Sequence, residues 1–298
     1  MFPPDSPSPA AAVPVTVSSL RDEVSGVLER AGVPDPVVDA ELLIGHVLDA
    51  GRGRVQALLH MGSEVSDDDA ARVRELAARR ATREPLQHIT GRAPFRSLEL
   101  AVGPGVFVPR PETEQVVQFA IDALRAVPSP EPIGVDLGTG SGAIALAMAT
   151  EVPHARVVAV ENSPEAFIWA RRNVEESGAS NARVVFVDLA DALPELDGTV
   201  DVVISNPPYI PAEAIPRDPE VRLFDPPAAL YGGADGLDVV RTISRVAQRL
   251  LHPGGTLVLE HGELQGAEIR GILTADGWRA AATHRDLTTR DRTTTAVR

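Results

Sequence analysis

Apolar, strand-like segments alternate with helical segments from Pro109 to the C-terminus, and this alternation constrains the fold more than any other feature of the chain. The predicted strands are Ile133–Asp136, Arg156–Val160, Val184–Asp188, Val202–Ser205 and Thr256–Glu260. The predicted helices are 112–127, 142–150, 164–177 and 237–251. Because such alternation is typical of parallel strands joined by helices, we expect a doubly wound, mostly parallel α/β sheet. The segment from Trp278 onward predicts a terminal hairpin at the sheet edge, which brings the sheet to seven strands.

The first part of the chain has a different composition and predicts a separate domain. Residues 19–84 are rich in Ala, Leu and Arg and show helical periodicity, which favours a small helical bundle. Residues 1–18 contain five prolines and predict a disordered tail. Residues 85–108 combine alternating apolar positions with Gly and Pro, which predicts a β-hairpin linker to a larger domain at 109–298.

Composition and charge exclude several classes of protein. The chain has no Cys, and all 28 of its basic residues are Arg, so it has no thiolate or Schiff-base chemistry and no P-loop lysine. The net charge of −14 disfavours a nucleic-acid partner, although an acidic chain can still carry a local basic patch. No apolar run approaches 18 residues and the N-terminus lacks secretory-signal features, so we expect a cytoplasmic protein with no membrane contact. No His, Asp or Glu cluster has metal-ligand spacing, so we expect no metal.

The stretch "VDLGTGSGAIALAMA" follows the first predicted strand of the sheet and opens the next helix. Gly138, Gly140 and Gly142 allow a tight turn that brings backbone N–H groups close to a ligand. In such sheets, ligands bind at the carboxyl ends of the strands near a switch point. Glu161 ends the next predicted strand, where its carboxylate can accept hydrogen bonds from both hydroxyls of a ribose. The pattern therefore predicts a nucleoside-containing ligand.

Glycine spacing alone leaves the ligand open, because Gly138, Gly140 and Ala143 also satisfy the looser dinucleotide pattern. Asp136 at the end of the first strand favours a cationic ligand, since a carboxylate would repel a pyrophosphate. S-adenosylmethionine carries a sulfonium and an amino group and has no phosphate. Asp188 could accept a hydrogen bond from an adenine amino group, and an ordinary solvated aspartate is an equally good interpretation of this residue alone.

The stretch "SNPPYI" ends the fourth predicted strand and is suited to an –NH2 group on an sp2 carbon. The side-chain oxygen of Asn206 can accept one N–H and the rigidly held carbonyl of Pro207 the other. Two such acceptors orient the nitrogen toward a methyl donor, while Tyr209 packs over the planar group, so catalysis rests on positioning. As a lone tetrapeptide these residues could equally be a proline-stiffened strand exit.

Several motifs together resemble the HemK/PrmC family of protein-(glutamine-N5) methyltransferases, which act on bacterial peptide chain release factors. The motifs, in family order, are "PLQHITG", "FVPRPETE", "VDLGTGSGAIAL", "SNPPYI", "FDPPAALYGGADGLDVVRTI" and "LEHGELQG". "NPPY" alone is shared with nucleic-acid amino methyltransferases, whereas its combination with "PRPETE" is more specific. Two residues depart from the family pattern: Glu161 stands where members often carry Asp, and Leu189 where many carry an aromatic.

The resemblance implies a cofactor, a substrate and their sites. S-adenosylmethionine, which leaves as S-adenosylhomocysteine, would be bound by Gly138, Thr139, Gly140, Ser141, Gly142, Glu161, Asp188, Leu189 and Asn206. The substrate glutamine would be bound by Asn206, Pro207, Pro208, Tyr209, Phe107 and Arg110. The catalytic residues would be Asn206, Pro207 and Tyr209. Residues 111–113 would line the mouth of the pocket, and the helical domain would grip the release factor.

The predicted function is methyl transfer to the glutamine of the Gly-Gly-Gln loop in class 1 release factors, by a monomer. The alternatives are a nucleic-acid amino methyltransferase (adenine-N6 or guanine-N2) and a ribosomal-protein glutamine methyltransferase. A NAD-dependent oxidoreductase would share the glycine loop but leave Asp136 and "NPPY" unexplained.

Overall fold

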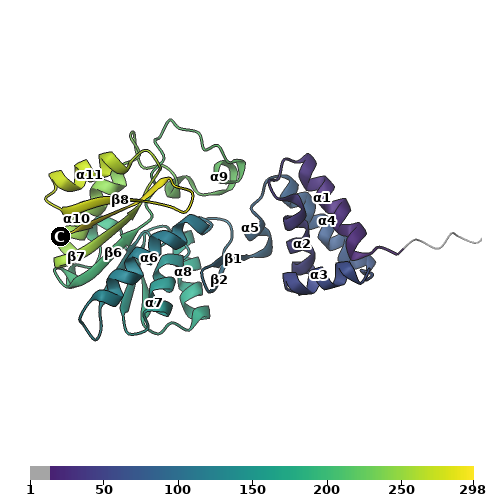
Figure 1. The fold of residues 1–298 in the computed structure, drawn as a ribbon, viewed down its shortest axis with the longest axis horizontal. Helices are drawn as coiled ribbons and strands as arrows, with labels where there is room; N and C mark the ends of the chain where they lie inside the picture. Colours follow the sequence, from purple (N-terminus) through teal and green to yellow (C-terminus); the bar gives the residue numbers. More distant parts are fainter. Residues whose placement is uncertain (1–13) are drawn as a thin grey trace, which may run out of the picture. The chain divides into compact units, whose positions relative to one another are not determined.

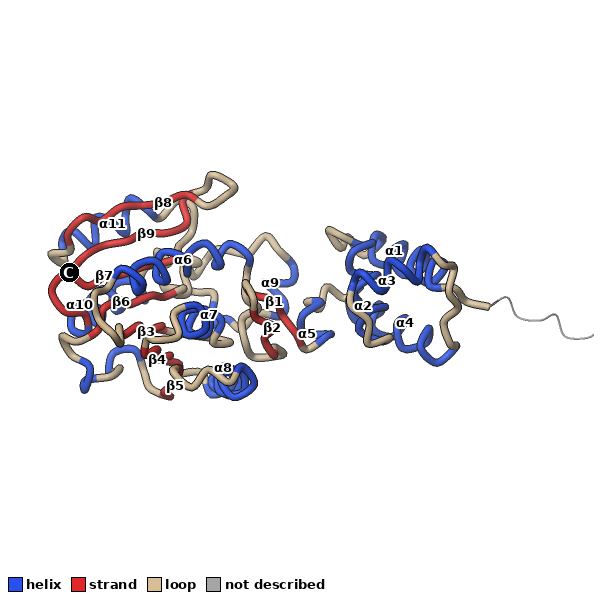
Figure 2. The backbone as a smooth tube through the Cα atoms, turned by 60° about the horizontal axis from the view of Figure 1, so that its bottom comes forward, coloured by secondary structure: helices blue, strands red, loops and turns tan. Residues whose placement is uncertain are grey.

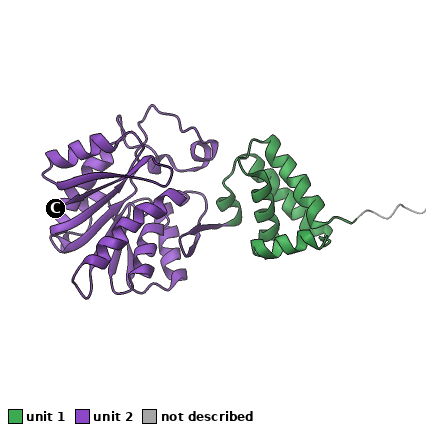
Figure 3. Ribbon diagram, viewed as in Figure 1, with its two compact units in different colours: residues 1–90 green, residues 91–298 purple. Residues whose placement is uncertain are grey.

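The computed structural model describes residues 14–298, and these form two compact units, 14–90 and 91–298 (Figure 3). Most of the predicted tail at 1–18 lies outside the described residues. Its last residues are part of the first unit, because Thr16 caps a helix that begins at Val17. The predicted linker at 85–108 is divided: a short helix at Leu86–Thr90 belongs to the first unit, and the hairpin that follows belongs to the second.

The first unit is a helical bundle. Its helices are α1 (Val17–Arg30), α2 (Pro36–Val47), α3 (Arg52–His60), α4 (Asp67–Ala81) and α5 (Leu86–Thr90). Helix α1 begins with a capping box, in which the side chains of Thr16 and Ser19 each accept the other residue's backbone N–H. Ser66 caps α4 as its position predicts. The apolar faces meet in one core around Leu20, Leu43 and Ile44, which is the reason these short helices are stable together.

The second unit contains one seven-stranded sheet flanked by helices (Figures 1 and 2). The strands are β3 (Ile133–Leu137), β4 (Arg156–Glu161), β5 (Ala182–Phe186), β6 (Val200–Ser205), β7 (Leu251–Glu260), β8 (Arg279–Arg285) and β9 (Asp291–Val297). Their order is β5-β4-β3-β6-β7-β9-β8; the first five are parallel, and β9 runs antiparallel to both its neighbours. This confirms the predicted doubly wound sheet and its terminal hairpin.

The larger helices cover both faces of this sheet. They are α6 (Pro111–Ala126), α7 (Ala143–Glu151), α8 (Pro164–Ser177), α10 (Asp238–Leu250) and α11 (Gly266–Ala275), with a short α9 (Pro219–Phe224) after β6. Helices α6 and α7 pack with the residues of one face, and α10 and α11 with those of the other (Figure 1). Local signals explain the ends of α8: Ser163 caps it, Pro164 occupies its first turn, and Gly178 ends it in the left-handed conformation.

The third parallel strand differs from its prediction. We expect Val184–Asp188 from the apolar pattern, whereas β5 is Ala182–Phe186. Asp188 leaves the strand because its carboxylate accepts the backbone N–H of Ala190 and caps a short 3-10 turn, η1 (Leu189–Asp191).

A two-stranded hairpin, β1 (Arg92–Phe95) and β2 (Leu98–Ala101), belongs to the second unit rather than to a free linker. Asn173 of α8 is the reason: its Oδ1 accepts the N–H of Ala101 at 2.7 Å, and its Nδ2 donates to the carbonyls of Ala101 and Ser141. Phe95 is fully buried in the α6–α7 core. The hairpin is therefore fixed to the glycine loop of the sheet.

The order of the strands places two loops together. Strand β3 lies between β4 and β6. After β3 the chain adds β4 and β5 on one side of it, and then adds β6 and β7 on the other side. A crevice forms at such a switch point, outside the carboxyl ends of the strands. The glycine loop follows β3 and "NPPY" follows β6, so both loops reach this crevice. Within residues 14–298 no helix is long and apolar enough to cross a membrane.

Candidate active site

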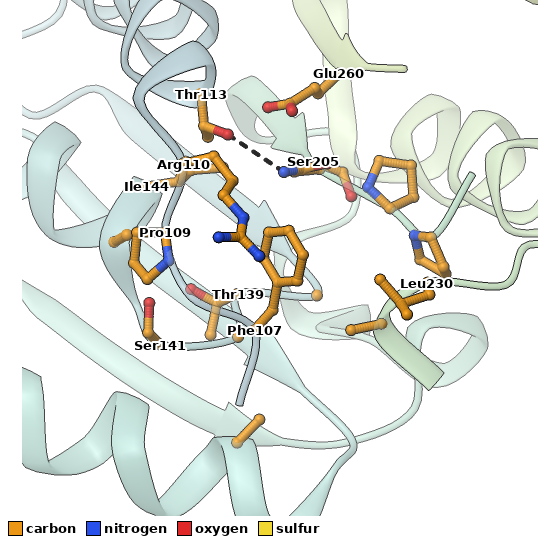
Figure 4. A pocket seen from close by; sticks show the side chains of 18 of the residues that line it. Phe107, Pro109, Arg110, Thr113, Thr139, Ser141, Ile144, Ser205, Leu230 and Glu260 are labelled. Atoms are coloured by element: carbon orange, nitrogen blue, oxygen red, sulfur yellow. Dashed lines mark hydrogen bonds between the residues drawn. The ribbon is translucent and has the colours of Figure 1, made fainter. Parts of the chain in front are cut away.

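A cavity of about 560 Å³ lies at the carboxyl ends of β3, β6 and β7, with Thr113, Thr139, Ser205 and Glu260 among the residues that line it (Figure 4). Its volume is within the usual range for small-molecule sites. The predicted site residues that line it are Phe107, Arg110, Gly138, Thr139, Gly140, Ser141, Glu161, Leu189, Asn206, Pro207, Pro208 and Tyr209. The structure thus brings together residues from the glycine loop, the "FVPRPETE" segment and "NPPY".

The glycine loop contains residues in the left-handed backbone conformation, which glycine adopts without strain. Gly138 and Gly140 have φ values of 74° and 59°, where a side chain would be strained. The N–H groups of Gly138 and Thr139 both donate to the carbonyl of Val160 on β4, at 2.9 Å each. Gly142 does not line the cavity; it lies against Ala170 of α8 and allows the loop to enter α7.

Glu161 lines the cavity with a carboxylate that is held by the backbone. Oε2 accepts the N–H of Gly140 at 2.8 Å, and Oε1 accepts those of Asn162 and Ser163 at 3.0 and 2.9 Å. The side chain is therefore fixed across the mouth of the glycine loop. A carboxylate has about four lone-pair positions, so three hydrogen bonds leave an acceptor position for a ligand hydroxyl.

Two other predicted carboxylates lie outside the cavity lining. Asp136 is completely buried, and Thr139 Oγ1 donates to its Oδ2 at 2.5 Å. Burial raises the pKa of Asp136 to about 7. Asp188 is exposed, and its carboxylate accepts hydrogen bonds from Ala190 N and Asn162 Nδ2. Asp136 thus supports the loop from below, and the adenine contact of Asp188 stays a prediction.

The "NPPY" segment is fixed at both ends. Ser205 Oγ donates to the carbonyl of Leu137 at 2.6 Å, which ties the end of β6 to that of β3. Gln265 Nε2 donates to the carbonyl of Tyr209 at 2.9 Å. The carbonyl of Ile210 accepts the N–H of Gly232, whereas that of Pro207 receives no hydrogen bond from the described residues. An acceptor is therefore available beside the side chain of Asn206.

A salt bridge joins the segment before α6 to the loop after "NPPY". Arg110 Nη2 lies 2.6 Å from Asp225 Oδ2, and its guanidinium carbon lies 4.9 Å from the ring centre of Phe107. Burial raises the pKa of Asp225 to about 6 against the lowering effect of Arg110. This contact aligns Arg110 and Phe107 along one wall of the cavity (Figure 4).

Sequence reasoning missed Glu260, which ends β7 and lines the cavity with a side chain that is 3% exposed. Burial raises its pKa to about 7, while Thr113 and Arg292 lower it. A carboxylate at the end of a predicted strand was the available signal, as it was for Glu161. The neighbouring His261 is structural: it is buried, contacts Thr294 Oγ1 and the carbonyl of Gly262, and lies outside the cavity lining.

Comparisons with known proteins give the family to which the chain is similar. A family model named PrmC N-terminal domain matches residues 19–91, and one named methyltransferase small domain matches 98–222. The chain is 54% identical to the release factor glutamine methyltransferase of Streptomyces coelicolor, over 93% of this chain and 97% of that protein. It is 41% identical to the 4-amino-L-phenylalanine/4-methylamino-L-phenylalanine methyltransferase of Streptomyces pristinaespiralis, over 97% of each chain. A solved release-factor-specific protein-(glutamine-N5) methyltransferase from Alicyclobacillus acidocaldarius matches at 28% identity and a TM-score of 0.41, covering 66% of this chain and 98% of that one.

The sheet order, the glycine loop after β3 and "NPPY" after β6 define an enzyme of the S-adenosylmethionine-dependent methyltransferase class. The 54% identity to the Streptomyces coelicolor protein, over 93% of this chain and 97% of that one, narrows the class to one family. The chain belongs to the release factor glutamine methyltransferase family.

Proposed function

We propose that this enzyme transfers a methyl group from S-adenosylmethionine to the side-chain amide nitrogen of the glutamine in the Gly-Gly-Gln loop of class 1 release factors. The observation that carries the proposal is the 54% identity to a release factor glutamine methyltransferase over nearly the full length of both chains. The lining of the cavity adds independent chemical support, because its acceptor groups suit a planar –NH2 group.

The residues of the glycine loop and Glu161 fit S-adenosylmethionine. Gly138 to Ser141 present a backbone surface without bulky side chains, and Glu161 retains an acceptor position for a ribose hydroxyl. Leu189 supplies an apolar contact for an adenine ring. The bound cofactor supplies a methyl group on a sulfonium centre, which becomes neutral S-adenosylhomocysteine.

The "NPPY" residues fit the acceptor amide. Asn206 Oδ1 and the carbonyl of Pro207 accept its two N–H groups, which holds the nitrogen lone pair toward the methyl group. As the N–CH3 bond forms, the S–CH3 bond of the cofactor would break and leave the neutral thioether. The nitrogen would then be cationic and strongly acidic, and it would lose its proton to water. Tyr209 is partly buried and retains its proton, since burial raises its pKa, so it packs against the planar group as a neutral phenol.

The test is the intact mass of a class 1 release factor after incubation with the enzyme and S-adenosylmethionine. One added methyl group is expected. It should be absent when the loop glutamine is changed to Ala and when the enzyme carries Asn206→Ala. Parallel reactions with DNA, tRNA and ribosomal proteins separate the alternative acceptors. Transfer to one of these and not to the release factor would contradict the proposal.

An aromatic amine is a second candidate acceptor, favoured by the relative that is named as a 4-amino-L-phenylalanine methyltransferase. An aniline nitrogen resembles the amide because it is also an –NH2 group on an sp2 carbon. Incubation with 4-amino-L-phenylalanine tests this candidate in the same assay. Faster methylation of this amino acid than of the release factor would reverse the assignment.

We infer that the helical unit serves to bind the body of the release factor, in keeping with its match to the PrmC N-terminal domain model. The enzyme is proposed to act as a cytoplasmic monomer. Size-exclusion chromatography with light scattering, alone and with the release factor, measures both the oligomeric state and the complex.

A further inference from the structure

Three side chains from three elements meet behind the acceptor site. Asn206 follows β6, Thr113 lies in the first turn of α6, and Glu260 ends β7. Asn206 Nδ2 donates to Thr113 Oγ1 at 3.4 Å, and the hydroxyl of Thr113 lowers the pKa of the neighbouring Glu260 carboxyl group. Figure 4 shows the carboxyl group of Glu260 beside Thr113, with the hydrogen bond from Asn206 drawn as a dashed line. Thr113 and Glu260 are 4% and 3% exposed, so water does not replace these partners.

The orientation of the Asn206 carboxamide decides whether it can hold an acceptor amide. Its oxygen and nitrogen ends have nearly the same shape, so the neighbouring groups determine which end faces the cavity. Only the oxygen can accept an N–H from the substrate. The –NH2 end would instead oppose that N–H donor.

The hydroxyl of Thr113 has a single hydrogen, and Glu260 determines its direction. An ionised Glu260 can only accept, so Thr113 donates to it and offers a lone pair to Asn206 Nδ2. The oxygen of Asn206 is then directed away from Thr113. A protonated Glu260 can donate to Thr113 instead, which frees the hydroxyl hydrogen for Asn206 Oδ1 and permits the opposite orientation.

We propose that Thr113 and Glu260 are positioning residues that fix the oxygen of Asn206 toward the acceptor nitrogen. The proposal rests on the proposed function, because only an N–H acceptor substrate needs this orientation. It also explains why a carboxyl group lies buried beside the cavity with an Oε2 atom that has no hydrogen-bond partner among the described residues.

The charged and titratable groups that act on Glu260 come from its surrounding elements. Arg292 of β9 lowers its pKa, Glu112 of α6 raises it, and Tyr209 faces it from the "NPPY" segment. With burial as the largest effect, the pKa of Glu260 is about 7. The correctly oriented Asn206 is therefore expected to become more populated as the pH rises through 7.

The first arm of the experiment measures single-turnover methyl transfer with Thr113→Val, Thr113→Ser, Glu260→Met and the double variant Thr113→Val/Glu260→Met. We expect each of the Val and Met variants to lose about 10-fold to 100-fold in rate, as misplaced catalytic groups do. The Ser variant keeps the hydroxyl, so its rate should stay within about threefold of the wild-type rate. The rate of the double variant should lie within about twofold of that of the slower single variant, because the two residues act as a unit. Melting temperature and S-adenosylhomocysteine affinity identify any variant that is merely misfolded.

The second arm follows the side-chain amide NMR signals of Asn206 in the full chain with pH. In the wild type these signals should titrate near pH 7, and Thr113→Val and Glu260→Gln should each abolish the titration. This arm separates the two proposals, since it reads the orientation of Asn206 even if the release factor is not methylated. Three results would overturn the proposal that Thr113 and Glu260 position Asn206. They are fully additive losses in the first arm, a Thr113→Val enzyme as fast as the wild type, and Asn206 signals that do not titrate.

Discussion

At the scale of single residues, the carboxyl groups around the cavity differ in how the protein holds them. Glu161 accepts three backbone N–H groups, whereas Asp136 and Glu260 are buried with one unpartnered oxygen each among the described residues. Burial raises the pKa of both Asp136 and Glu260 to about 7. This contrast suits Glu161 to bind a ligand directly and the other two to support neighbouring groups.

Changing Glu161 to Gln tests its role at the ribose. The amide –NH2 would face backbone N–H donors that the carboxylate now accepts. The neutral amide would also accept a hydrogen bond from a ribose hydroxyl less well than the carboxylate does. Because hydrogen bonds to charged groups contribute about 1.5–3 kcal/mol, we expect S-adenosylhomocysteine to bind about 10-fold to 100-fold more weakly by calorimetry. Glu175→Gln is the matched control, since Glu175 is exposed on α8 and outside the cavity lining, and its affinity should not change. Equal losses in both variants would contradict the assignment.

At the scale of elements, the position of each loop depends on a contact with another segment. Asn173 of α8 binds the hairpin strand β2 and the carbonyl of Ser141 in the glycine loop. Gly232 and Gly236 lie close under the "NPPY" segment, where an added Cβ would be 2.4 Å from the Pro208 carbonyl oxygen and 2.3 Å from that of Tyr209, respectively. The two loops of the cavity are thus supported from outside their own strands.

Asn173→Asp should displace the glycine loop, because it removes the hydrogen bond from Asn173 Nδ2 to the carbonyl of Ser141. An aspartate would place a carboxylate against the carbonyl oxygens of Ala101 and Ser141, which now accept from Nδ2. An unpaired buried charge of this kind costs about 3–5 kcal/mol, so we expect a large drop in the melting temperature and weaker cofactor binding. Asn162→Asp, whose side chain is exposed, is the control for the melting temperature alone, because Asn162 also lines the cavity. Unchanged melting in the Asn173 variant would show that the hairpin is not fixed in this way.

Gly236→Ala should displace the "NPPY" segment. Gly236 has a φ of 79°, and its new Cβ would lie 2.3 Å from the Tyr209 carbonyl oxygen, so either the loop or Tyr209 must move. Methyl transfer is expected to fall by about 10-fold or more, since small displacements of positioning groups have large effects. Gly271→Ala in α11 meets no atom within 4 Å and should keep full activity. An active Gly236→Ala enzyme would mean that this close contact is not needed for catalysis.

Sequence reasoning was most successful for the residues and elements whose signals are local. The alternating strands, the glycine loop and "NPPY" each have a signal within a few residues, and strand order then brings the two loops together. Asp188 and β5 show where local patterns are insufficient, because β5 ends at Phe186 and the Asp188 carboxylate caps the turn that follows by accepting the N–H of Ala190. Thr113 and Glu260 are distant in the sequence, and so are strand β2 and Asn173. Such contacts depend on packing that no single motif contains.

At the scale of the whole molecule, the site lowers stability at neutral pH. Glu260 has an ordinary pKa near 4.5 when unfolded and about 7 when folded. The folded state therefore binds its proton more strongly between these values, and the free energy of unfolding falls as the pH rises through this window. The shift corresponds to about 3 kcal/mol once Glu260 is fully ionised. Such a cost is consistent with a buried carboxyl group kept for function.

Comparison of the wild type with Glu260→Gln isolates this contribution. The variant should have nearly the wild-type free energy of unfolding at pH 5, where Glu260 is protonated in the fold. At pH 8 it should be more stable by about 2–3 kcal/mol, because it avoids burying a charge. Urea denaturation of the second unit at both pH values measures the difference. A variant that is less stable than the wild type at pH 8 would show that the charged Glu260 is stabilising.

The central claim is that the enzyme methylates one glutamine through the "NPPY" site, and fragment mass spectrometry of the treated release factor tests it most directly. The account predicts one methyl group on the side chain of the Gly-Gly-Gln glutamine with the wild-type enzyme, and none with Asn206→Ala. A methyl group on another residue, or on this glutamine with the Asn206→Ala enzyme at the wild-type rate, would contradict it.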